Sequence, residues 1–469
     1  MQTSMPPSAT KRLLHTKTYR LHFDDDPEYK KDPRYAILSH RWLSKEITFD
    51  KIEHARLEDN DVESPVKLKV KGACAKAQEH KIQWLWIDSI CINKANSVED
   101  QKAITSMFTW YRRASVCYTY LSDVVVPATK AKAVYDVGRG PCPCPFWRAE
   151  DPSKPSEWFE RGWCLQELLA PNQMEFYDRN WTKMGTRAEL AEAIAAITRI
   201  KPEYLTGEED FRKASIAAKM SWMAGRKTSV HEDMAYSMVG IFDITSMATG
   251  VSDGMKAFFR LQKEIINTSV LADETIFAWK APASGLPHTS HPAGDWAQDE
   301  WGLLAPSPDC FRDCGDIIPD GEARPRRLDG YKVEREGLKF PFPYTDFVPR
   351  REQVLQLCLM PLPWLNIIGF EFWKLADSKR KEFAVRLNCV RKDPNGKWRP
   401  VQVNLRRSST GWKMETLVFR RYNCHQLDLA QKRLKELYSG WTIVGKHRNR
   451  MRKKMMTILQ PEPDSEEAR

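Results

Sequence analysis

Short apolar runs alternate with amphipathic stretches at the start of the chain. Nearly every residue is apolar in three of these runs, which predicts buried strands over residues 35–40, 84–92 and 116–121. A charged helical pattern fills residues 50–81, and Ser97 with Asp100 predicts the start of a second helix. Strands that alternate with helices in this order favour right-handed crossovers between neighbouring parallel strands. The pattern therefore predicts an α/β fold, with a doubly wound parallel sheet and flanking helices.

The character of the chain changes several times after this first segment. Prolines and glycines interrupt the pattern over about residues 122–157, which predicts a surface insertion. A helical pattern then resumes over Glu160–Leu169, and a strand is predicted at Met174–Tyr177. These shifts predict five parts: a flexible tail over 1–10, the α/β domain over 11–182, a helical extension over 183–280, a β-rich C-terminal domain over 281–460 and an acidic tail over 461–469.

Local start and turn signals support the two later domains. The pairs Thr186/Glu189 and Ser229/Glu232 fit the capping box of a helix N-terminus, and Asp253 is a candidate cap for a further helix. In the C-terminal part, strands are predicted over residues 354–360, 383–390 and 401–405, with a hairpin turn at Asn395-Gly396.

The charge balance is basic but modest, with 73 Lys and Arg against 62 Asp and Glu and a formal charge of +11. Nucleic-acid binding needs a defined basic face, so this dispersed charge predicts no nucleic-acid partner. The basic run over residues 446–454 is interpreted as a solvated cluster, with a nuclear-import signal as the alternative. Neither a membrane span nor a secretion signal is evident, and we expect a cytoplasmic protein.

The 11 cysteines are an odd number scattered through a long chain, which favours free thiols. Cys142 and Cys144, even together with Cys164 and His40, lack the paired ligand spacing of a structural zinc site, so no metal is expected. The chain also lacks a GxxxxGK[ST] phosphate loop. We therefore expect no tightly bound cofactor.

Polar residues follow the apolar core of two predicted strands. In an open parallel sheet, ligands bind beyond the carboxyl ends of the strands. The candidates for such contacts are Ser39, Arg41, Trp42, Asp88, Cys91 and Asn93. A buried carboxylate such as Asp88 needs partners, so the alternative is that Asp88 shapes the following loop through nearby backbone groups.

The segment from Arg161 to Leu168 places an aromatic ring and a carboxylate at helical spacing. Trp163 and Glu167 are four residues apart and share one face of the predicted helix. A partly desolvated carboxylate can stabilise a developing cation, which is useful for breaking a glycosidic bond. The alternative is that Glu167 pairs with Arg161 or Arg41 at the surface of the helix.

Three blocks of the sequence resemble the fungal heterokaryon incompatibility (HET) domain. These blocks are Tyr-Ala-Ile-Leu-Ser-His-Arg-Trp at 35–42, Leu-Trp-Ile-Asp-Ser-Ile-Cys-Ile-Asn at 85–93 and Arg-Gly-Trp-Cys-Leu-Gln-Glu-Leu-Leu-Ala-Pro at 161–171. Further blocks over 220–226, 232–243, 257–262, 276–279 and 302–308 resemble the extension found in many such proteins. HET domains are in turn similar to Toll/interleukin-receptor (TIR) domains, which have a flavodoxin-like sheet and, in many members, cleave NAD.

The resemblance implies a role in fungal non-self recognition and programmed cell death. The W-C-x-x-E helix of TIR domains carries the catalytic acid, which corresponds here to Glu167, with Trp163 lining the pocket. NAD is then the implied substrate, cleaved to nicotinamide and an ADP-ribose product. The partners implied are further copies of the chain or an incompatibility protein. The alternative is a non-catalytic HET module that signals by assembling with other proteins.

Overall fold

The computed structural model describes residues 11–54, 64–126, 145–245, 247, 253–268, 273–287, 299–321, 332–334, 337–340, 347–348, 382–407, 417–429 and 456–459. The chain forms two compact units. The first comprises Met1–Lys213 and Gly225–Ala257, and the second comprises Ala214–Ala224 and Phe258–Arg469. Residues of the predicted helical extension, 183–280, are thus divided between the two units. The predicted tails, residues 127–144 of the predicted insertion, the 354–360 strand and the basic run at 446–454 lie outside the described residues.

A seven-stranded sheet is central to the first unit, in the order β2-β1-β4-β3-β5-β6-β7. Its strands are β1 (Arg12–His15), β2 (Leu21–Phe23), β3 (Tyr35–His40), β4 (Trp84–Trp86), β5 (Val116–Tyr120), β6 (Met174–Tyr177) and β7 (Lys183–Thr186). The four strands β4, β3, β5 and β6 are parallel, which confirms the predicted α/β core. The sheet as a whole is mixed, because the β1–β2 hairpin and β7 add antiparallel strands at its two sides.

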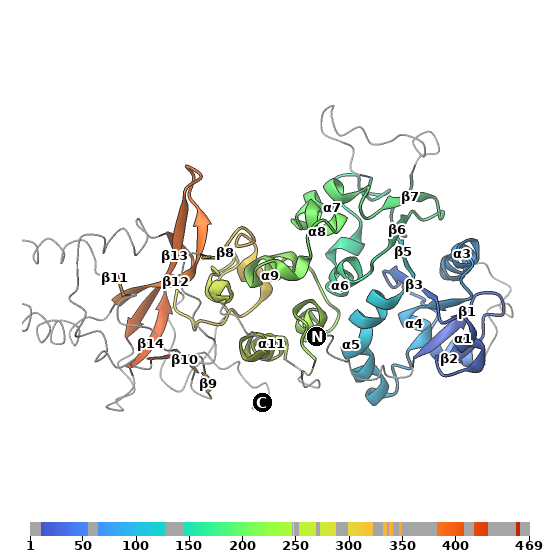
Figure 1. The fold of residues 1–469 in the computed structure, drawn as a ribbon, viewed down its shortest axis with the longest axis horizontal. Helices are drawn as coiled ribbons and strands as arrows, with labels where there is room; N and C mark the ends of the chain where they lie inside the picture. Colours follow the sequence, from blue (N-terminus) through green and yellow to red (C-terminus); the bar gives the residue numbers. More distant parts are fainter. Residues whose placement is uncertain are drawn as a thin grey trace, which may run out of the picture. The chain divides into compact units, whose positions relative to one another are not determined.

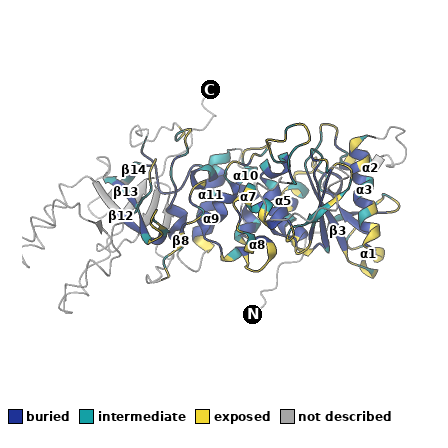
Figure 2. Ribbon diagram, turned by 90° about the horizontal axis from the view of Figure 1, so that it is seen from above, coloured by how far each residue is buried: buried dark blue, intermediate teal, exposed yellow. Residues whose placement is uncertain are grey.

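Helices cover both faces of this sheet. They are α1 (Pro27–Lys31), α2 (Phe49–His54), α3 (Pro65–Glu79), α4 (Asp88–Cys91), α5 (Ser97–Arg113) and α6 (Trp163–Leu169), with the 3-10 helix η2 (Glu157–Glu160) before α6. Figure 1 shows α5 and α6 on one face of the sheet and α3 on the other, and the view from above agrees for α5 and α3. All six residues of β3 are buried between these layers (Figure 2), as expected for a strand that is apolar on both faces.

Two details of this region differ from the sequence prediction. The strand expected over residues 84–92 ends at Trp86, because Asp88 begins the short helix α4 and its carboxylate accepts the Ser89 N–H at 2.7 Å. Helix α5 is capped by Asn96, whose side chain accepts the N–H groups of Val98 and Glu99, and not by Ser97.

The chain order of the parallel strands reverses next to β3. The first parallel strand, β3, lies between the second, β4, and the third, β5. The connection from β3 to β4 therefore runs to one side of β3, and the connection from β4 to β5 returns to the other side. Crevices for ligands form at such a switch point, outside the carboxyl ends of the strands. Here Ser39 pairs with Thr119, and His40 pairs with Tyr120 at that end. This is the edge at which the sequence predicted a site.

Short helices follow the first sheet in the chain. They are α7 (Ala191–Thr198), α8 (Pro202–Thr206), α9 (Ile216–Met223), α10 (Asp233–Tyr236) and α11 (Gly254–Thr268), with 3-10 helices η3 (Phe211–Lys213), η4 (Val239–Phe242) and η5 (Glu274–Phe277). Thr186 and Glu189 form the predicted reciprocal bonds, and Asp253 accepts the N–H groups of Met255 and Lys256. The box predicted at Ser229 is wrong, because α10 starts after Glu232 without a side-chain cap.

The second unit contains a nine-stranded β-sheet, which confirms a β-rich C-terminal part. Its strands are β8 (Ile318–Pro319), β9 (Lys332–Glu334), β10 (Gly337–Phe340), β11 (Phe347–Val348), β12 (Glu382–Lys392), β13 (Trp398–Arg407), β14 (Leu417–Tyr422), β15 (Asp428–Leu429) and β16 (Met456–Leu459), after the 3-10 helix η6 (Pro308–Phe311). Seven strands follow the order β11-β12-β13-β14-β16-β10-β9, while β15 pairs with β13 and β8 with β12. All pairings are antiparallel except β14 with β16. The predicted hairpin joins β12 to β13, and Gly396 adopts a φ of 75° in its turn, a conformation that suits glycine.

The described cysteines are buried free thiols, as predicted: Cys74, Cys91, Cys117, Cys164, Cys310, Cys314, Cys389 and Cys424. Among the described helices, none has the length and apolar character needed to cross a bilayer.

Candidate functional site

The carboxylate of Glu167 lies at the end of β3. Glu167 is only 7% exposed, and Ser39 Oγ donates a hydrogen bond to its Oε2 at 2.5 Å. Ser39 in turn accepts a bond of 2.9 Å from Trp158 Nε1, and both partners are buried. Strand β3 therefore meets the neighbouring elements η2 and α6, which are more than a hundred residues away in sequence, at this carboxylate. The structure brings together Ser39 and Glu167, two residues that the sequence analysis named as separate candidates, and it adds Trp158.

Burial controls the ionisation of this site. Desolvation raises the pKa of Glu167 from its ordinary value of 4.5 to about 7. The hydrogen bond from Ser39 opposes this rise, the negative charge of Asp88 adds to it, and the guanidinium of Arg161 opposes it. Near neutral pH, the carboxyl group is therefore divided between its protonated and ionised forms.

A second polar group surrounds Asp88 at the same end of the sheet. Trp42 Nε1 donates to Asp88 Oδ2 at 2.7 Å, so these two predicted residues are in contact. His40 Nε2 lies 3.7 Å from Asp88 Oδ1, and burial lowers the pKa of His40 well below its usual range. Lys94 Nζ lies 4.0 Å from the centre of the Trp42 ring. Asp88 also accepts the Ser89 N–H, so it does bond a nearby backbone group, but that group lies in the first turn of α4 and not in a loop.

Arg41 does not pair with Glu167. Its guanidinium forms an ion pair with Glu157 on η2, and Glu157 also contacts Arg148 at 3.2 Å. Both Arg41 and Glu157 are about one-third exposed, so the pair lies near solvent. Arg41 is thus placed where an anionic ligand could exchange with a protein carboxylate.

The remaining predicted residues make contacts within the fold. Trp163 Nε1 donates to Asp233 Oδ2 at 2.9 Å. The buried Cys91 thiol lies against the backbone of its own helix turn, 3.4 Å from the Ile87 nitrogen. Asn93 Oδ1 accepts the Ala95 N–H at 3.1 Å, which shapes the loop before α5. Their roles in binding a ligand stay predictions.

Sequence reasoning missed two residues near Glu167. Trp158 reaches Ser39 from η2, and the only sequence signal was an aromatic residue close to the Trp163 block. Arg226, 6% exposed, is buried, donates to the Arg161 carbonyl and interacts electrostatically with Cys164 and Glu167; it stands at the end of the 220–226 block.

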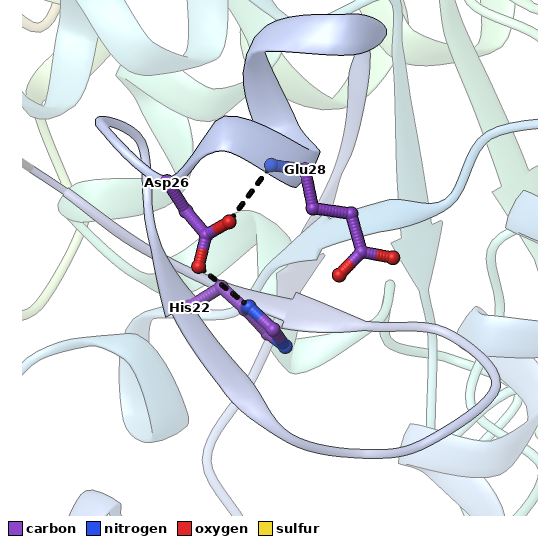
Figure 3. A group of neighbouring side chains, drawn as sticks. All are labelled: His22, Asp26 and Glu28. Carbon is purple, nitrogen blue, oxygen red and sulfur yellow. Dashed lines mark hydrogen bonds and ion pairs between the residues drawn. The ribbon is translucent and has the colours of Figure 1, made fainter.

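His22, Asp26 and Glu28 form the candidate metal-ligand group in the part of the chain that the structure describes (Figure 3). Their ligand atoms lie within 4.8 Å of one another. Asp26 Oδ1 accepts the Glu28 N–H at 2.8 Å, and Asp26 Oδ2 lies 3.1 Å from His22 Nδ1. A helix cap and a His–Asp pair account for this arrangement without an ion.

Comparisons with known proteins point to one family. The model of the heterokaryon incompatibility protein family (HET) matches residues 35–138. The vegetative incompatibility protein HET-E-1 of Podospora anserina is 38% identical over 238 residues, which is 50% of this chain and 16% of that protein. The matched segment therefore spans less than a fifth of the relative's length. No solved structure matches the chain.

Proposed function

This chain carries a HET domain homologous to that of an incompatibility protein, and we propose that the domain cleaves NAD in a fungal non-self recognition response that ends in cell death. In the proposed reaction, water attacks the ribosyl carbon bonded to nicotinamide. The electrons of that bond pass to the nicotinamide nitrogen, which leaves as the neutral base. The products are nicotinamide, ADP-ribose and a proton.

The observation that carries this proposal is a buried carboxylate at the switch point of the sheet. Ser39 Oγ, near the C-terminal end of β3, donates to Glu167 Oε2 at 2.5 Å, and the strand order reverses next to this strand. The parallel strands run in the order second, first, third, fourth, which is typical of flavodoxin-like sheets. This order supports the likeness to TIR domains that the sequence implies.

The chemistry needs a negative charge more than a strong acid. Nicotinamide already carries a positive charge in NAD, so the enzyme must mainly stabilise an oxocarbenium-like ribosyl centre. Ionised Glu167 can supply that charge, and its buried surroundings strengthen the interaction. Ser39, held by Trp158, orients the carboxylate. In this proposal Arg41 releases Glu157 and binds a phosphate of the substrate, while Trp42 and Asp88 line the same edge.

A non-catalytic assembly module is the second candidate function. The observation that favours it is the enclosure of Glu167, which is 7% exposed and already hydrogen-bonded. A carboxylate in this setting can serve the packing of α6 alone. The domain would then act through contacts with other copies of the chain or with an incompatibility partner.

NAD consumption by the full chain, fused to an oligomerising tag, separates the two candidates. We compare the wild type with Glu167→Gln, and with Glu192→Gln as the control, because Glu192 is an exposed acid on α7. Circular dichroism checks the fold of each variant. The proposal expects nicotinamide release from the wild type and the control, and at least a hundredfold less from Glu167→Gln.

The opposite result is equally clear. If the tagged wild type releases no nicotinamide while both it and Glu167→Gln kill cells on expression, the catalytic proposal fails. The assembly module then becomes the function to pursue.

A further inference from the structure

We propose that residues 226–233 form a strap that positions Glu167 and favours its ionised form, with Arg226 and Asp233 as positioning residues. The strap lies outside the 35–138 family match and outside the α/β domain predicted over 11–182. The inference concerns the site proposed above, and its activity readout rests on that proposed function. A second readout does not depend on catalysis.

The strap fixes the point at which α6 begins. Lys227 N–H donates to the Glu160 carbonyl at 2.6 Å, and Gly162 N–H donates to the Lys227 carbonyl at 2.8 Å. Arg226 Nη1 adds a bond of 3.0 Å to the Arg161 carbonyl. Helix α6 has no side-chain cap of its own, so these bonds hold the turn that a cap would otherwise hold. Glu167 lies five residues beyond that turn.

The approach of the strap is close. A Cβ atom at Gly162 would lie 2.6 Å from Thr228 Cγ2, a separation that real Cβ atoms do not show. Glycine at this position therefore lets the two segments run side by side. Arg161 and Lys227 form a parallel bridge at the same place.

Asp233 fixes the first residue of α6. Its Oδ2 accepts the Trp163 Nε1–H at 2.9 Å. Burial raises the pKa of Asp233, and the bond from Trp163 opposes that rise. Because Trp163 and Glu167 are on one face of the helix, a rotation of α6 about its axis would move both residues together. The contact with Asp233 resists that rotation.

Arg226 adds an electrostatic effect to these contacts. Its side chain is buried, which lowers its pKa to about 10, and attraction to Cys164 and Glu167 opposes the lowering. The guanidinium therefore remains charged near neutral pH. A buried cation that attracts a carboxylate favours its ionised form, which is the form that the proposed reaction needs, and Arg161, whose carbonyl accepts the Arg226 bond, acts on Glu167 in the same direction. An apolar side chain of similar size could pack in the same place but could not do this.

The test uses the full chain and five variants. Arg226→Met removes the charge, and Arg226→Lys retains it. Asp233→Leu removes the acceptor of the Trp163 bond, and Asp233→Asn retains an acceptor oxygen. Lys227→Met is the matched control, because Lys227 belongs to the strap but its side chain is 81% exposed, makes only a long, solvent-exposed ion pair of 3.9 Å with Glu160, and leaves the backbone bonds unaffected.

Each variant is measured in two ways. The free energy of unfolding is followed from pH 4.5 to 8.5 with Glu167 and again with Glu167→Gln, so that the difference reports the titration of Glu167 alone. The rate of NAD cleavage is measured over the same range, with kcat and KM separated.

We expect Arg226→Met to move the midpoint of the Glu167 titration upward by about 1 pH unit, the usual effect of losing a nearby opposite charge. NAD cleavage at pH 7 falls about fivefold in this variant, because a midpoint that moves from about 7 to about 8 leaves about one molecule in ten, instead of one in two, with the ionised carboxylate. Asp233→Leu lowers kcat with less change in KM, and Asp233→Asn restores most of the rate. Lys227→Met leaves both readouts unchanged.

Two results would overturn the strap proposal. One is a Glu167 midpoint that stays fixed in Arg226→Met, or that moves equally in Lys227→Met. The other, which applies even if Arg226→Met does not fold, is wild-type behaviour of Asp233→Leu in both readouts. If the wild type cleaves no NAD, the proposed function fails, but the titration midpoints still test the strap.

Discussion

The ionisation of Glu167 predicts an unusual dependence of stability on pH. Glu167 has an ordinary pKa of 4.5 in the unfolded chain and a pKa of about 7 in the folded protein. The folded state therefore retains a proton that the unfolded state has lost, and the stability contributed by the protonated group is fully present below pH 4.5. As the pH rises from 4.5 through 7, this contribution is lost. The shift of about 2.5 units corresponds to about 3 kcal/mol, at 1.36 kcal/mol per unit.

Glu167→Gln removes the titrating group and keeps an oxygen that can accept the bond from Ser39. We expect the free energy of unfolding of this variant, relative to the wild type, to increase by about 3 kcal/mol between pH 4 and pH 8.5. Urea unfolding at several pH values measures this difference, and the titration of all other groups cancels in it. Glu192→Gln is the control and should run parallel to the wild type.

The reasoning is refuted if the curves for Glu167→Gln and the wild type remain parallel within about 0.5 kcal/mol over the whole pH range. Parallel curves would mean that the carboxylate is as well solvated in the folded protein as in the unfolded chain. The carboxylate could then not act as a desolvated charge in any reaction.

Two further substitutions test the surroundings of the site. Ser39→Ala removes the donor to Glu167 and the acceptor of a buried indole N–H, so it should lower the free energy of unfolding by about 1–3 kcal/mol. It should also move the midpoint of the Glu167 titration further upward. An unchanged urea midpoint would contradict this expectation. Lys69→Met leaves the buried carboxylate of Glu46 without the ammonium now 2.7 Å away, which should cost about 3–5 kcal/mol. Lys76→Met, which breaks a more exposed pair, should cost less than about 1 kcal/mol in the same urea experiment, and equal losses would show that burial does not govern these pairs.

The elements that the sequence predicted best are those whose pattern is local. Strand β3 matches its predicted bounds over residues 35–40, because an apolar run that ends in polar residues and is buried between layers of helices has few alternatives. The end of the strand that starts at Trp84 was harder to predict, because apolar residues such as Ile90 and Ile92 suit a buried helix turn as well as a strand. Asp88 broke that run, and its carboxylate turned out to bond the first turn of a helix.

The candidate site shows the same division between local and tertiary information. Helical spacing placed Trp163 and Glu167 on one face, and the strand ends indicated Ser39 as a neighbour. No spacing rule brings Trp158 to Ser39 or Arg226 to Arg161, because each contact depends on how separate segments pack. The ion pair between Arg41 and Glu157 likewise depends on how β3 and η2 pack together, which no local pattern in the sequence predicts.

The interleaving of the two compact units has a consequence for inheritance. Residues 225–257, which include the strap, belong with the first sheet, whereas residues 214–224 before them belong with the second unit. A recombination event that transfers the complete site from one gene to another must therefore also transfer a piece of the second unit. A breakpoint after residue 213 would instead join Glu167 from one parent to Arg226 from the other. Functional exchange between such genes should thus favour breakpoints beyond residue 257, so that both parts of the site descend from one ancestor.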